Sequence, residues 1–256
     1  MGGERKTNLY HCTNSDALTA ILGSRHFLYS YCLEDHYVHK EGRFTLEGRA
    51  YAMVCFADLL EEELPDHMLQ FGANSYIMMD KGWAKKNYIS PVKYYFKRDL
   101  PITMFLSMIK NVETLYNGNE TMALKFLDAM EIMAPFFKLY EGKYYLKGTN
   151  QLSNEPTEFF LEREWRSIPD TNAGEWRYLD EQSYVIENAR KIAVQELKNR
   201  CVLDFGWNDV LKIGCKEDKK NEVLKIIHES FGIDGNEDEI LKKIEVLPAK
   251  DIWFSN

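Results

Sequence analysis

Near the middle of the chain, two glutamates, two arginines and a tryptophan follow one another within five residues. Because successive side chains of a strand point to opposite faces, a strand here places Glu162, Glu164 and Arg166 on one face. Arg163 and Trp165 then lie on the other face. Two carboxylates on one face can reach the same pocket and take part in acid–base chemistry there. The alternative is an edge strand whose charges prevent pairing with another sheet.

The bulk composition is that of a folded globular protein. Of the 256 residues, 45% are apolar and 28% are charged, and the chain contains 15 Tyr, 14 Phe and 5 Trp. This composition excludes global disorder and supplies enough apolar area for a solid core. We therefore predict a single domain over residues 1–256.

The charge balance restricts the class of partner. Forty acidic residues against 32 basic ones give a net charge of −8, which argues against general binding to nucleic acid or to an anionic membrane. A local exception lies between residues 81 and 98, where six lysines and arginines occur. This segment is read either as a solvated helix and strand edge or as a phosphate-binding patch.

The five cysteines, at positions 12, 32, 55, 201 and 215, form no CxxC pair. An odd count without a signal peptide predicts reduced thiols and a cytoplasmic protein. No apolar run approaches the ~20 residues that a membrane-spanning helix needs. We expect neither a membrane span nor a bound metal.

Short predicted strands alternate irregularly with helices along the chain. Without regular βαβ repeats, this order favours an α+β fold with a mixed, mostly antiparallel split sheet and flanking helices. Polar loops are predicted at 33–37 and 148–156, and residues 42–48 are expected to be flexible. The predicted strands are 8–13, 26–32, 51–57, 75–79, 92–96, 143–147, 159–169, 201–205, 210–215 and 244–247. The main predicted helices are 14–22, 58–71, 184–198, 216–231 and 237–244.

Two segments stand apart from this series. Apolar residues at helical spacing predict a helical hairpin inserted at residues 101–140, with a turn at Asn117–Gly118–Asn119. The insert either packs over one face of the sheet or forms a lid or partner surface. Residues 200–256 are predicted as a C-terminal strand–helix extension.

Sequence motifs give little support for common nucleotide chemistry. The chain lacks GxGxxG, GxxxxGK[ST], GxSxG and HExxH patterns, so a glycine-rich phosphate loop is not expected. The remaining candidates for chemistry are residues 10–13 with His11, the pair Tyr29 and Tyr31, and the carboxylates at 162 and 164. Each of these also has a structural reading when taken alone, and the functional case rests on their combination.

Several motifs lie in a fixed order along residues 8–170. They include YHCT at 10–13, MVCFAD at 53–58 and REWRSIP at 163–169, and residues 16–18, 21–22, 27–35, 67–68, 71–72, 83–84, 87, 90–92 and 94 accompany them. In these residues the chain resembles the AbiGi abortive-infection family. That resemblance implies a role in bacterial phage resistance, as the antitoxin of a toxin–antitoxin pair.

The same opening resembles, more distantly, the ADP-ribosyltransferase fold. This resemblance implies that His11 hydrogen-bonds NAD, that Tyr29 or Tyr31 stacks on the nicotinamide, and that Glu164 or Glu162 holds the ribose hydroxyl. It makes Glu164, Glu162 and His11 the candidate catalytic residues. The candidate NAD-binding residues are Tyr10, His11, Thr13, Tyr29, Tyr31 and Arg166.

The chemistry of NAD cleavage agrees with these residue types. Breaking the nicotinamide–ribose bond builds oxocarbenium character, which a carboxylate stabilises, and a second carboxylate can act as general base. Arg163 or Arg166 could neutralise the pyrophosphate. The first hypothesis is therefore an NAD-dependent ADP-ribosyltransferase in phage defence. The second is a non-catalytic antitoxin or sensor that binds a cognate toxin or a phage protein through its acidic surface.

Overall fold

The computed structural model describes residues 7–40, 43–96, 132–146, 148–169, 177–233 and 237–248, together with positions 107 and 111. Its centre is a mixed sheet in the order β13-β12-β5-β1-β4-β9-β6, and β3 and β10 also pair with β4. Every pairing in this sheet is antiparallel except β12 with β13. The predicted α+β class with a mostly antiparallel sheet is confirmed.

The strands of the central sheet range from two to seventeen residues. Their bounds are β1 Asn8–Thr13, β3 Ser30–Lys40, β4 Arg43–Leu59, β5 Ser75–Met79, β6 Ser90–Pro91, β9 Glu164–Ser167, β10 Tyr178–Asp180, β12 Val210–Lys216 and β13 Ile244–Leu247. Two small sheets accompany them: β2 (His26–Phe27) pairs with β11 (Leu203–Asp204), and β7 (Lys93–Tyr95) pairs with β8 (Phe137–Leu139).

The helices α1 and α9 begin within one residue of their predicted starts, whereas α2 begins at Leu64 and α8 at Lys220, later than the predicted 58 and 216. Asn14 caps α1 by accepting a hydrogen bond from the Ala17 amide, and Asp80 caps α3 in the same way through the Trp83 amide. The α-helices are α1 Ser15–Ser24, α2 Leu64–Gln70, α3 Lys81–Lys86, α6 Glu181–Val185, α7 Glu187–Arg200, α8 Lys220–Phe231 and α9 Glu237–Lys243. Short 3₁₀ helices are η1 Glu61–Glu63, η2 Ala134–Phe136, η3 Phe159–Glu162, η5 Trp207–Asp209 and η6 Glu217–Lys219.

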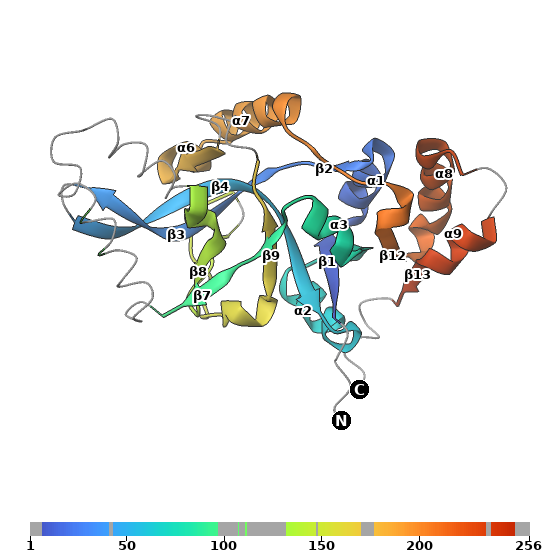
Figure 1. Ribbon diagram of the computed structural model, residues 1–256, viewed down its shortest axis with the longest axis horizontal. Coiled ribbons are helices and arrows are strands. Elements are labelled where there is room, and N and C mark those ends of the chain that lie inside the picture. Colours follow the sequence, from blue (N-terminus) through green and yellow to red (C-terminus); the bar gives the residue numbers. More distant parts are fainter. Residues whose placement is uncertain are drawn as a thin grey trace.

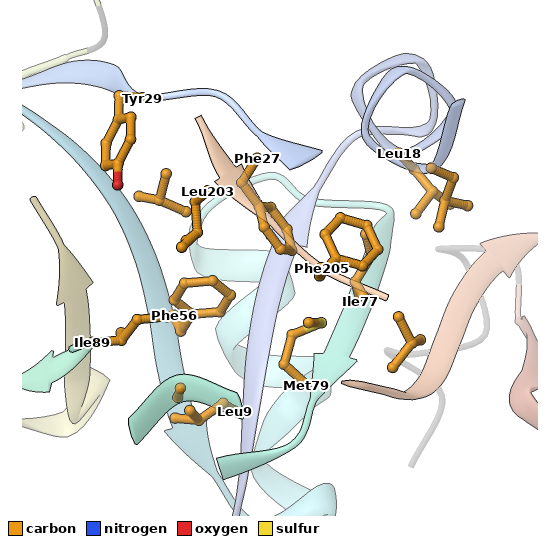
Figure 2. Packing of buried hydrophobic residues seen from close by; sticks show 14 of the residues in the cluster. Leu9, Leu18, Phe27, Tyr29, Phe56, Ile77, Met79, Ile89, Leu203 and Phe205 are labelled. Carbon is orange, nitrogen blue, oxygen red and sulfur yellow. The ribbon is translucent and has the colours of Figure 1, made fainter. Parts of the chain in front are cut away.

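The two sides of the sheet carry different clusters. One side, the core face, carries Leu9, Phe56 and Ile77, which pack with the apolar residues of α1 and α8 (Figure 2). The other side, the α2 face, carries Tyr10 and Ala57, which pack with the apolar residues of α2. Neighbouring residues of β1 and of β4 belong to different clusters, because successive side chains of a strand point to opposite faces.

The loop predicted at 33–37 is wrong, and residues 43–48 of the segment expected to be flexible lie in a strand. Residues 30–40 and 43–59 form the long β3–β4 hairpin, which extends from one end of the sheet in Figure 1. The sequence of this segment resembles a loop because Glu34 and His36 are polar. Both residues lie in β3 and are largely buried, and Glu34 pairs with Arg166. Apolar alternation through Tyr29, Tyr31 and Leu33 continues into this strand, and all three are buried.

Two further predictions need correction. The strand predicted at 159–169 is a 3₁₀ helix over Phe159–Glu162, followed by Arg163 with a φ of 42° and only then by β9. A left-handed residue at this junction turns the chain into the strand. The helix predicted to run through Tyr140 ends earlier, because Phe137–Leu139 form β8 beside β7.

The two segments predicted to stand apart from the strand series, at residues 101–140 and 200–256, have different outcomes. Most of the hairpin predicted at 101–140 lies outside the described residues. The segment predicted as a C-terminal extension contributes β12 and β13 to the central sheet, so it completes the sheet. Figure 1 shows α8 and α9 beside these strands, at the end away from the β3–β4 hairpin.

Candidate functional site

A cavity of about 730 Å³ opens on the α2 face. It is lined by side chains from β1, β3, β4, α2, β8, η3 and β9, including Tyr10, Tyr31, Glu34, Glu162 and Glu164. Pockets that bind small molecules or cofactors span roughly 300–1,000 Å³. The cavity is therefore large enough for a small molecule or for several side chains of a partner.

One wall of the cavity is a cluster of five charged side chains, which we call the ion cluster. It consists of Glu34 from β3, Lys138 from β8, Glu162 from η3, and Glu164 and Arg166 from β9. The exposed fractions of these side chains lie between 0 and 17%. Buried charges persist only when they are paired and hydrogen-bonded, so the contacts within the cluster decide its stability.

Arg166 is the fully buried centre of the ion cluster. Its Nε donates to Glu164 Oε1 and its Nη2 to Glu164 Oε2, each at 2.8 Å, and Nη2 also lies 2.6 Å from Glu34 Oε1. Its Nη1 donates to the carbonyl oxygen of Pro135 in η2. Two parallel hydrogen bonds between guanidinium and carboxylate are the strongest geometry for such a pair.

Lys138 contacts all three carboxylates of the ion cluster. Its Nζ lies 2.8 Å from Glu162 Oε2, 3.0 Å from Glu164 Oε2 and 3.2 Å from Glu34 Oε1. The ammonium also lies 4.7 Å from the centre of the Phe159 ring, which is a cation–π distance. Lys138 therefore donates hydrogen bonds to Glu162 and Glu164 and forms an ion pair with Glu34 inside the protein.

The three carboxylates differ in their affinity for protons. Burial raises the pKa of Glu164, but the charges of Arg166 and Lys138 outweigh burial and hold this pKa well below its usual value. The pKa of Glu34 is lowered by the same two cations against burial. At Glu162 burial prevails over the attraction of Lys138, so its pKa is raised. Three carboxylates thus share two cations.

His36 lies beside this cluster and is buried, with 3% of its side chain exposed. Its Nε2 is 3.7 Å from Glu34 Oε2, and neither atom has a hydrogen-bond partner among the described residues. Burial lowers the pKa of His36 to about 4, although the charge of Glu34 acts in the opposite direction. The imidazole is therefore neutral at pH 7.

The structure brings four of the sequence-predicted site residues to one cavity. Tyr10, Tyr31, Glu162 and Glu164 contribute to its lining, and Arg166 lies directly behind Glu164. Of the residues assigned to the other face, Arg163 pairs with Glu63 and Trp165 packs against the core face. Glu162 is the last residue of η3 and does not belong to β9, but the turn at Arg163 places its carboxylate beside Lys138, which also contacts Glu164.

The other predicted residues lie elsewhere. The Nδ1 of His11 is 2.9 Å from the carbonyl oxygen of Cys55, and its ring packs edge-on against Phe27 on the core face. Burial lowers the pKa of His11. Tyr29 shares a buried hydrogen bond of 3.0 Å with Ser167 and belongs to the core cluster. Thr13 pairs with Ser75 at the end of β1 and does not line the cavity.

Three members of the site were missed in the sequence. Glu34 and His36 fell in a predicted loop, and Lys138 fell in a predicted helix. The continued alternation of buried Tyr31 and Leu33 is the signal that could have extended β3 through residue 36. Nothing local marks Lys138, because its partners come from β3, η3 and β9.

The arrangement also defines what the site offers chemically. Both oxygens of Glu164 accept charged hydrogen bonds, and the Cys55 thiol provides another donor. A general base needs an available lone pair and a pKa near the working pH. The site is thus a charged, aromatic-lined receptor in which the carboxylates already have internal partners.

A search for membrane-spanning helices found none with the necessary length and apolarity in the part of the chain that the structure describes. Comparisons with curated proteins and with solved structures gave no match. One family model matches residues 25–213, and its description reads "Putative abortive phage resistance protein AbiGi, antitoxin". The match covers the β3–β4 hairpin, α2, η3 and β9, and hence every member of the ion cluster. The chain belongs to the AbiGi family of abortive phage resistance proteins.

Proposed function

We propose that this protein is a non-catalytic antitoxin of a phage-resistance system and that it acts by binding a protein partner. The observation that carries the proposal is the state of the carboxylates in the cavity. Glu164 is held by Arg166 and Lys138, and Glu162 by Lys138, so the wall is built from internal ion pairs. Family membership supports the antitoxin role.

The placement of the aromatic and histidine residues supports the same view. An NAD-cleaving site needs its histidine, stacking ring and carboxylate around one ligand. His11 and Tyr29 contact the core face, whereas Glu162 and Glu164 line the cavity on the α2 face. The sheet therefore separates His11 and Tyr29 from the two glutamates, whereas Tyr31, the other candidate stacking ring, lines the same cavity as the glutamates.

The net charge of −8 fits recognition of a basic partner. Complementary charge accelerates association and disfavours wrong partners, even where it adds little affinity. Exposed Leu69 and Phe71 at the cavity provide apolar contact area beside the acidic wall. Such a mixture of apolar and charged groups is typical of a protein interface.

The direct test is neutralisation of a toxin encoded next to this gene. Co-expression is expected to restore growth, and the two proteins are expected to co-purify as a complex. Purified protein incubated with labelled NAD, with and without the partner, is expected to give neither label transfer nor free nicotinamide. Growth arrest that persists despite full co-expression would refute the antitoxin role.

The second candidate is an NAD-binding protein with ADP-ribosyltransferase activity. The observation in its favour is that Tyr10, Tyr31, Glu162 and Glu164 contribute to one cavity of suitable volume. On this alternative, wild-type protein releases nicotinamide and the Glu164→Gln variant does not, while circular dichroism shows that the variant is folded. This result would replace the binding role with catalysis.

A further inference from the structure

We propose that the cavity accepts an organic cation, the guanidinium or alkylammonium group of a basic side chain. The group would lie against the ion cluster and the aromatic residues of the lining. The inference rests on the proposed binding function and deepens it, because it names the chemical group of the partner that this cavity takes.

Acidic residues outnumber basic ones around the cavity. Among the described residues, the lining includes the acidic residues Glu34, Asp35, Glu162 and Glu164 and the basic residues Lys138 and Lys143. Arg166, buried behind the wall, adds a third cation. His67 also lines the cavity, and its imidazole is neutral at pH 7 because burial lowers its pKa to about 4. One negative charge is left over.

The excess negative charge lies closest to Glu162. In the ion cluster, Arg166 and Lys138 both serve Glu34 and Glu164, while Glu162 has only a share of Lys138. A buried carboxylate without a full counter-charge is costly in a medium of low polarity. Burial raises the pKa of Glu162, which is the response expected of such a group. An incoming cation supplies the charge that the cluster lacks.

The ion cluster contains a buried acceptor without a donor among the described residues. Glu34 Oε2 receives no hydrogen bond from any described residue, and the nearby Nε2 of His36, on a side chain 97% buried, has none either. Glu34 lines the cavity. Because Oε2 itself is closed off from solvent, a guanidinium or ammonium in the cavity compensates the charge of the Glu34 carboxylate without a hydrogen bond to this oxygen. An anionic group would instead meet these oxygens with repulsion.

The cavity lining is also rich in aromatic residues. Tyr10, Tyr31, Phe71, Tyr144 and Phe159 all contribute to the lining. Ring faces attract cations, and attraction of this kind is worth roughly 0.5–2 kcal/mol depending on solvation. Lys138 lies 4.7 Å from the Phe159 ring centre, so a cation–π contact is already formed in this cavity by the protein's own lysine. Carboxylates and ring faces together favour a flat organic cation.

The test is calorimetric titration of the full-length protein with argininamide and with citrullinamide. The two probes have the same length, but citrullinamide carries a neutral ureido group in place of the guanidinium. Argininamide is expected to bind at least tenfold more tightly. Inorganic pyrophosphate, an anionic probe, is expected not to bind.

Two variants report on the ion cluster and the aromatic lining, and a third is the control. Glu34→Gln is expected to weaken argininamide binding about tenfold, which corresponds to about 1.4 kcal/mol. Phe71→Leu, at a side chain that is 47% exposed and hence tolerant of change, is expected to weaken binding severalfold with the fold intact. Glu237→Gln removes an exposed carboxylate from α9 and is expected to leave binding unchanged.

The source of the cation is resolved by a second titration with a blocked pentapeptide, Gly-Gly-Arg-Gly-Gly. Tighter binding of the peptide than of argininamide supports a protein side chain, whereas binding of argininamide alone supports a free small cation. Equal affinity for argininamide and citrullinamide, or full affinity in both Glu34→Gln and Phe71→Leu, overturns the inference. Toxin neutralisation without argininamide binding would defeat this inference alone and leave the antitoxin role intact.

Discussion

Arg166 and Glu164 form a bidentate ion pair along a single strand, with both nitrogen–oxygen distances at 2.8 Å. Residues two apart on a strand share a face, so the pairing needs no distant element to form. Burial of the pair depends on Glu34 and Lys138, which arrive from β3 and β8. This pair fixes the geometry of the cavity wall and underlies the first predictions.

Arg166→Met should destabilise the protein by about 3–5 kcal/mol, because it leaves Glu34 and Glu164 buried with one cation fewer. Arg163→Met is the comparison, three positions earlier in the chain. Its side chain is 39% exposed and its ion pair with Glu63 is open to solvent, so the loss should be only about 1 kcal/mol. Urea unfolding at pH 7 measures both values. Equal losses would show that the buried pair has no special role.

The two cavity glutamates should respond in opposite ways to neutralisation. Glu164→Gln removes the partner of Arg166 and should lower the free energy of unfolding by about 2–4 kcal/mol at pH 7. Glu162→Gln removes the excess charge and keeps an acceptor oxygen for Lys138, so its effect should stay within about 1 kcal/mol or be stabilising. Chemical denaturation compares the two. A larger loss for Glu162→Gln would contradict the assigned distribution of charge.

His36 should make stability depend on pH in the mildly acidic range. Its folded pKa, about 4, lies below the ordinary value of 6.5, so the folded state binds fewer protons between these values. Stability is therefore full above pH 6.5 and falls as the pH drops towards 4, by up to about 3 kcal/mol from this group.

His36→Phe should reduce the slope of stability against pH in this window and leave the slope above pH 7 unchanged. The ring contact with Tyr51, at 4.8 Å between centroids, can be kept by phenylalanine. His67 titrates in the same window, so the slope should decrease without vanishing. Thermal denaturation at a series of pH values provides the measurement. An unchanged slope would mean that His36 is not held neutral by the fold.

Gly214→Ala should lower the free energy of unfolding by disturbing the packing on the α2 face. A Cβ at this position of β12 would lie 2.1 Å from the Tyr76 ring, which packs edge-on against Tyr10. Overpacking of this kind costs about 1–3 kcal/mol. Gly23→Ala is the control, because a Cβ there meets its nearest neighbour at 3.8 Å in a helix and should stabilise by about 0.5–1 kcal/mol. A tolerated Gly214→Ala in urea denaturation would indicate that the Tyr76 ring moves easily.

The sequence by itself determined the strands at 8–13, 51–57 and 75–79, because apolar runs bounded by capping and turn residues leave little choice of element. It also determined that positions 164 and 166 share a face, since this follows from the period of a strand alone. The AbiGi resemblance was readable in ordered motifs and is confirmed by the family match.

Only the tertiary structure decided which charges meet. Glu34, Lys138 and Glu164 are more than a hundred residues apart at the extremes, and no local pattern relates them. Residues 33–37 looked like a loop because the partners of Glu34 are distant in sequence. Glu34 meets Arg166 only after β3 and β9 have both paired with β4. The side of the sheet on which His11 and Tyr29 pack was likewise set by long-range contacts. Local periodicity fixes which residues share a face, whereas the packing of distant elements fixes what that face encounters.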